Sequence, residues 1–122
     1  MTDARTRKYR GRKYGAQHHT CFYCAFPMWT QAPADFAHKY CISVREALRF
    51  RCTAEHLRAR CDGGTSRVDN IVAACWFCNS QRHHRKKPPQ PDTYRAFIQR
   101  RLARQSWHPP WLHKMLAQAA TA

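Results

Sequence analysis

The chain has 122 residues, which suits one domain with a modest core and leaves no room for a second independent core. Lys and Arg number 22 against 7 Asp and Glu, so the formal net charge is +15 and the isoelectric point about 10.3, which favours a polyanionic partner such as nucleic acid. No apolar run reaches the roughly 18 residues of a membrane span and no apolar leader opens the chain, so we expect a cytoplasmic protein without a membrane partner.

The first half of the chain divides into a basic arm and the start of a core. Residues 1–16 hold six Lys or Arg without helical or strand periodicity, which predicts a flexible basic arm. The core is expected over residues 17–90. Within it, the apolar spacing after Asp35, a candidate N-cap, predicts a helical insertion over about 36–49.

The second half predicts a hairpin followed by helices. Residues 50–57 and 70–75 have strand character, and a loop with paired glycines at 63 and 64 joins them. Residues 76 to about 86 are polar and free of Gly and Pro, which indicates a helix that ends before Pro88. C-terminal helices are expected within 91–122, over about 93–105 with Asp92 as cap and from Pro110 to about 119.

Four of the seven cysteines form two close pairs. The pairs Cys21-x2-Cys24 and Cys75-x2-Cys78 are 50 residues apart, and each can place two thiolates on one metal ion. Four thiolates make a closed tetrahedral zinc site, which is structural because no position is left for water or substrate. The alternative is that these are reduced cysteines buried as small hydrophobic side chains.

Residues 55–79, EHLRARCDGGTSRVDNIVAACWFCN, resemble the HNH endonuclease family. The family shows an acidic residue or His before a His, a basic Gly-Gly loop, an Asn before a short apolar strand, and Cys-x-x-Cys followed by Asn or His. The resemblance, extended over residues 21 to about 86, implies an α+β fold: a small ββα-metal core with structural zinc, flanking helices and the basic arm. The activity that it implies is metal-dependent hydrolysis of phosphodiester bonds.

His56 is the candidate general base, because imidazole takes up a proton near neutral pH and phosphodiester hydrolysis needs an activated water. By resemblance Glu55 and Asn79 are ligands of the catalytic ion. Asn79 and His83 lie four residues apart on the predicted helix and share a face, and His83 matches an additional ligand in relatives such as the colicin nucleases. His84 is the competing position. The alternatives are that Glu55 is a solvated strand carboxylate and that His83 contacts phosphate.

Asn70 resembles the middle Asn of the family, whose amide bridges the hairpin loop and holds the base in place, and turn formation by Asp69-Asn70 is the alternative. Basic residues around the site are candidate phosphate contacts: Arg58, Arg60, Arg82, Arg85, Lys86 and Lys87. The expected partner is DNA, double-stranded by preference. A double-strand cut would need a homodimer or two visits, since one site handles one phosphodiester.

The ligand types suggest the ions. Oxygen ligands favour Mg²⁺ or Mn²⁺ at the catalytic site, and a His ligand widens tolerance to Ni²⁺, Co²⁺ or Zn²⁺. Two alternatives to a free-standing nuclease remain: a zinc-dependent module that binds nucleic acid without cutting it, and a nuclease subunit of a larger phage or mobile-element assembly. Retention of the base, both Asn residues and the acidic neighbour argues against a pure binding module.

Overall fold

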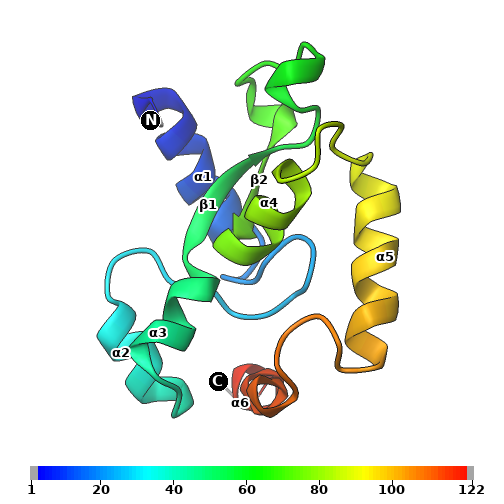
Figure 1. Ribbon diagram of the computed structural model, residues 1–122. Coiled ribbons are helices and arrows are strands. Elements are labelled where there is room, and N and C mark those ends of the chain that lie inside the picture. Colours follow the sequence, from blue (N-terminus) through cyan, green and yellow to red (C-terminus); the bar gives the residue numbers. More distant parts are fainter. Residues whose placement is uncertain (1–2, 121–122) are drawn as a thin grey trace.

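The structure, a computed structural model that describes residues 3–120, is built around one antiparallel hairpin (Figure 1). Strand β1 spans Cys52–His56 and strand β2 spans Ile71–Cys75, with Cys52 paired to Cys75 and His56 to Ile71. Helix α4, Trp76–His83, follows β2 directly and packs against both strands. The α+β class, the two strands and the helix after them are therefore confirmed, with α4 ending shortly before the predicted residue 86.

A tight loop joins the strands and contains two 3-10 turns, Arg60–Asp62 and Val68–Asn70. Gly63 has a φ of +84°, in the left-handed region that glycine adopts at little cost. A Cβ on Gly64 would lie 1.7 Å from the carbonyl oxygen of Arg58, so only glycine lets the loop fold back this closely. The paired glycines thus bring residues 58–65 against the end of β1.

Helix α1 contradicts the expectation of an irregular N-terminal arm, because it spans Ala4–Ala16 and packs against both strands. Asp3 caps it by accepting a hydrogen bond from the Thr6 amide. Thr6 is buried, and the Tyr14 hydroxyl donates to the carbonyl of Met28. Sequence periodicity missed this helix because its contacts with the core come from polar and amphipathic side chains and not from an apolar stripe.

The predicted helix over 36–49 is also corrected, since it is two short helices. Helix α2 spans Pro33–Tyr40 with Ala32 as its N-cap, and α3 spans Val44–Ala47 and continues as a 3-10 turn over Leu48–Phe50. Cys41 has left-handed backbone angles and ends α2, and a Ser43 capping box starts α3. The proline at the first helical position, and not Asp35, sets the start.

The C-terminal part closes the core. Helix α5 spans Pro91–Ala103 with Gln90 as N-cap, and a 3-10 turn over Pro110–His113 leads into α6, Lys114–Ala120. Buried aromatic and aliphatic side chains from the segment after α1, from the turn after α3 and from these C-terminal elements form one core: Tyr23, Phe26, Phe50, Tyr94, Ile98, Leu112 and Met115. Within residues 3–120 no helix is long and apolar enough to cross a membrane.

Candidate functional site

The two cysteine pairs meet in the interior. The sulfurs of Cys21, Cys24, Cys75 and Cys78 all lie within 4.8 Å of one another, and all four residues are buried. A tetrahedral ion with Zn–S bonds of about 2.3 Å places its sulfurs about 3.8 Å apart, and the Cys24 and Cys75 sulfurs are 4.0 Å apart. The donor set and spacing fit a structural metal ion, as the sequence predicted.

The surroundings of these sulfurs also suit thiolates. The amides of Tyr23 and Cys75 donate to Cys21 Sγ at 3.3 Å each, and the Trp107 indole N–H donates to Cys78 Sγ at 3.3 Å. Burial raises the pKa of Cys78 well above its ordinary value, so its thiolate needs a cation nearby. A metal ion among the four sulfurs would supply that charge.

The residues named for catalysis gather at the other end of the hairpin. A hollow of about 300 Å³, which we name the His56 cleft, lies between β1, the loop after it and α4. Its lining includes five predicted site residues, two alanines and one cysteine: Glu55, His56, Arg60, Asn79, His83, Ala54, Ala59 and Cys61. The structure therefore brings the candidate base and the candidate ligands to one surface.

Glu55 is the most constrained side chain of the cleft, with only 1% of its surface exposed. Its Oε2 accepts from the Tyr23 hydroxyl at 3.0 Å and from the Arg82 guanidinium at 3.1 Å. Its Oε1 lies 2.7 Å from His83 Nε2. The Tyr23 and Arg82 donors thus fix Oε2, while Oε1 faces His83 in the cleft. Sequence reasoning missed Tyr23, whose position between two cysteines gives no sign of a partner 32 residues away.

His56 is half-buried at the end of β1, and its Nε2 accepts a hydrogen bond from Arg60 Nε at 3.2 Å. Because arginine can only donate, Nε2 carries a lone pair and the ring is neutral. Ser66 Oγ lies 3.2 Å from the same nitrogen. Burial lowers the pKa of His56, and the Arg60 charge lowers it further, so the imidazole is available as a proton acceptor near neutrality.

Asn79 lies on α4 with a defined amide orientation. Its Nδ2 donates to Thr53 Oγ1 at 3.0 Å and to the Ala54 carbonyl at 3.2 Å. The Thr53 hydroxyl donates its hydrogen bond to the Ala74 carbonyl, so its oxygen can only accept from Asn79. This orientation directs the amide oxygen of Asn79 away from the strand. His83, four residues later, lines the same cleft with its side chain 34% exposed.

Asn70 lies outside the cleft, beneath the loop. Its side-chain oxygen accepts from the Arg58 amide at 2.8 Å, and its Nδ2 donates to the carbonyls of Thr65 at 2.7 Å and Arg58 at 3.2 Å. Its backbone carbonyl accepts from the Leu57 amide at 2.9 Å. Asn70 therefore ties the two sides of the loop together directly after His56, and it does not touch the cleft itself.

The basic residues named as phosphate contacts separate into two groups. Five are exposed, and of these Arg60 lines the His56 cleft: Arg58, Arg60, Arg85, Lys86 and Lys87. Arg82 is 2% exposed, and it donates to Glu55, to the carbonyls of His56 and Leu57 and to that of Pro89. The expectation that Arg82 contacts phosphate is therefore wrong, because its guanidinium is fully used inside the protein.

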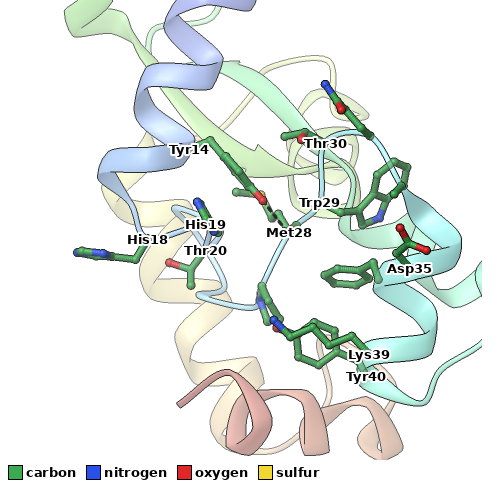
Figure 2. Close-up of a pocket in the computed structure, with 14 residues that line it drawn as sticks. Tyr14, His18, His19, Thr20, Met28, Trp29, Thr30, Asp35, Lys39 and Tyr40 are labelled. Carbon is green, nitrogen blue, oxygen red and sulfur yellow. Dashed lines mark hydrogen bonds between the residues drawn. The ribbon is translucent and has the colours of Figure 1, made fainter. Parts of the chain in front are cut away.

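A second hollow, of about 430 Å³, lies apart from this chemistry (Figure 2). It is bounded by the C-terminal end of α1, the segment after it and α2, with Tyr14, His19, Trp29 and Tyr40 among its lining residues. It shares no lining residue with the His56 cleft. Its lining also carries the titratable side chains of His18, His19, Asp35 and Lys39, but none of the predicted catalytic or metal-binding residues. The smaller cleft is therefore the candidate site because it joins the predicted base to the predicted ligands.

Comparison with known proteins agrees with this geometry. Residues 39–85 match the HNH endonuclease family model, a segment that contains the hairpin, α4 and the second cysteine pair, while Cys21 and Cys24 lie outside it. No curated protein and no solved structure matched the chain. The match supports a nuclease-like function. The resemblance seen in the sequence is confirmed, since residues 39–85 are similar to the HNH endonuclease family.

Proposed function

We propose that the chain is a metal-dependent endonuclease that hydrolyses phosphodiester bonds in double-stranded DNA, with His56 as general base. The observation that carries this proposal is that one cleft joins a neutral imidazole to a carboxylate, an amide and a second imidazole of metal-ligand type. A module that only binds DNA needs none of these groups in a common hollow. The net charge of +15 accounts for attraction of the polyanion.

In this proposal His56 Nε2 takes a proton from the attacking water. The water oxygen bonds to phosphorus while the bond from phosphorus to the 3′ oxygen breaks. Arg60 now donates to Nε2, so it must release the imidazole before that step. A DNA phosphate is a better partner for this exposed guanidinium than a neutral ring nitrogen. Substrate binding would thus draw Arg60 away and free the base.

Glu55 Oε1, the Asn79 amide oxygen and His83 Nε2 would hold the catalytic ion. The Glu55–His83 separation of 2.7 Å is a few tenths shorter than the roughly 3 Å between adjacent ligands of one small cation, so this contact opens slightly when an ion enters. A mixed oxygen and nitrogen set suits Mg²⁺ or Mn²⁺ and tolerates Ni²⁺, Co²⁺ or Zn²⁺. When bound, the ion supplies charge to the phosphate and the leaving oxygen. We assign the structural ion at the four cysteines as zinc.

The remaining residues position the base and the DNA. Asn70 keeps the loop closed on the end of β1, which fixes the backbone that carries His56. Arg58, Arg60, Arg85, Lys86 and Lys87 are the proposed phosphate contacts. We keep residues 17–90 as the nuclease core and 91–122 as the C-terminal helices that complete it.

A plasmid-nicking assay tests the proposal. With Mg²⁺ or Mn²⁺ the wild-type protein should convert supercoiled plasmid to nicked or linear forms, and with EDTA it should not. His56→Ala should reduce the rate at least about a hundredfold, the usual minimum for loss of a general base, while DNA binding is retained.

His84→Ala is the matched control, since this neighbouring exposed His lies outside the cleft lining. It should cleave within about twofold of wild type, because surface substitutions away from a site change little. Full activity of His56→Ala would refute the base. DNA binding without metal-dependent cleavage by the wild type would favour the binding module instead.

A further inference from the structure

Helix α1 carries an exposed row of positive charge that the nuclease site does not use. Arg5, Lys8 and Arg12 are exposed, and their spacing of three and four residues places them on one face. We name these three residues the α1 stripe. Within residues 3–120 none of them has an ion-pair partner. Tyr9 lies between them, with the Arg5 and Arg12 guanidiniums 5.8 Å and 5.6 Å from its ring centre.

The sequence of α1 lowers the intrinsic stability of the helix in two ways. Like charges three or four residues apart destabilise a helix by about 0.2–0.5 kcal/mol per pair. Gly11 and Gly15 each cost up to about 1 kcal/mol relative to alanine, although nothing lies within 4 Å of where a Cβ would be. Thr6 is nevertheless buried, α1 packs against both strands, and the Tyr14–Met28 hydrogen bond joins the helix to the segment that follows it. The stripe is therefore a rigid surface feature rather than a solvated tail.

The stripe begins beside the His56 cleft. Asp3, which caps α1, lies close enough to interact electrostatically with both Arg60 and His56. Figure 1 shows α1 alongside the hairpin, with its N-terminal end toward the same end of the molecule as the loop between β1 and β2. A polyanion seated at the cleft would thus meet the α1 stripe on the side of the base.

We propose that the α1 stripe binds the phosphate backbone of the same DNA duplex that occupies the His56 cleft. This inference rests on the proposed function for the identity of the polyanion. Arg5 and Arg12 are about 10 Å apart along the helix axis, close to the roughly 12 Å width of the major groove of B-DNA. Single strands are bound largely by exposed aromatic rings, whereas the ring beside the α1 stripe, that of Tyr9, lies between two guanidiniums. A duplex fits this surface better.

Two charge-matched triple variants test the proposal. One replaces the α1 stripe with Gln. The control replaces three exposed arginines, two in α5 and one at its C-cap, and α5 lies on the other side of the hairpin from α1 in Figure 1: Arg95, Arg100 and Arg104. Both lose three positive charges. Affinity for a 30-base-pair duplex is measured over a salt series without added Mg²⁺ or Mn²⁺ and without a chelator, so that cleavage does not interfere and the structural ion is not removed. Circular dichroism checks that both variants keep the helical content of the wild type.

Removal of the α1 stripe should reduce the slope of log affinity against log salt by about 2.7, since each lost phosphate contact removes about 0.9. The α5 variant should keep the wild-type slope. Equal losses in both variants, or none in the α1 variant, would overturn the proposal. Tighter wild-type binding to duplex RNA than to duplex DNA would overturn the choice of partner. Because no catalytic ion is added, these results are independent of whether the chain cleaves DNA.

Discussion

The Tyr23 hydroxyl offers the sharpest test of how the cleft is organised. Tyr23 is fully buried between Cys21 and Cys24, and it donates to Glu55 Oε2 at 3.0 Å. Tyr23→Phe removes one oxygen atom and no packing volume. A hydrogen bond to a charged group contributes about 1.5–3 kcal/mol, so the variant should lose about that much free energy of unfolding.

Catalysis should respond as well, because Tyr23 and Arg82 hold Oε2 and so orient Oε1 toward the proposed ion. Removal of a hydrogen bond to a metal ligand typically weakens metal affinity or activity about 10- to 100-fold. The Mn²⁺ concentration that gives half-maximal nicking by Tyr23→Phe should therefore rise about tenfold or more. Urea unfolding and a Mn²⁺ titration of the nicking rate measure the two effects.

Tyr94→Phe is the matched control. Tyr94 is equally buried, packs edge-on against Tyr23 with ring centres 4.9 Å apart, and donates its hydroxyl to the Cys78 carbonyl at 2.6 Å. This neutral bond contributes about 0.5–1.5 kcal/mol and does not reach Glu55. If both variants shift the Mn²⁺ requirement equally, or neither does, the Tyr23 hydroxyl does not orient the carboxylate.

Three further outcomes follow from the same contacts. Arg82→Met should lower the free energy of unfolding, measured in urea, by about 3–5 kcal/mol, because it leaves the buried Glu55 charge without its ion-pair partner. Arg85→Met, at an exposed arginine, should lower it by less than about 0.5 kcal/mol. Similar losses in the two variants would contradict the burial of Arg82. Burial lowers the pKa of His108 to about 3 from about 6.5 in the unfolded chain, so stability present above pH 6.5 is lost as the pH falls toward 3. Between pH 7.5 and 5.5 the wild type should lose about 1.4 kcal/mol more than His108→Gln, and parallel pH profiles would refute this. Metal analysis should find one zinc ion bound at the four cysteines, and Cys75→Ser should abolish both zinc retention and cooperative unfolding, while a folded, zinc-free variant would contradict the structural role.

Local sequence signals predicted the hairpin, α4 and the gathering of four sulfurs. Each depends on short spacing: strand alternation, a Gly-Gly loop, and cysteine pairs that a tight turn brings to one ion. The structure adds that Cys75 Sγ accepts the Cys78 amide and so caps α4. The same cysteine pair therefore specifies the helix start as well as the proposed metal site, which explains why both could be predicted from the sequence.

The failures share one cause, which is that the deciding partner lies far along the chain. Arg82 is one residue from His83 and looks like any exposed helix arginine, yet Glu55, 27 residues away, makes it a buried counter-ion. The helix expected over 36–49 is interrupted where Cys41 adopts left-handed backbone angles. Gly and Asn favour this conformation, so a Cys at this position gives no sequence signal for a helix end. Helix α1 is recognised only once Thr6 is seen to be buried against the hairpin.

The charge balance of the cleft has a consequence for how the proposed ion binds. Among the described residues that line the cleft, Glu55 carries the only carboxylate, and its charge is already paired with Arg82 at 3.1 Å. A divalent cation would therefore meet little net negative charge from the protein, and the scissile phosphate must supply the rest, as Mg²⁺ sites that use substrate phosphates do. Binding of ion and DNA should then be mutually favourable, by the same factor in each direction. With the inactive His56→Ala protein, Mn²⁺ should bind at least about tenfold more tightly when duplex DNA is present, which corresponds to about 1.4 kcal/mol of coupling. Equal Mn²⁺ affinity with and without DNA would show that the protein ligands suffice, and that the Arg82 charge does not limit the site.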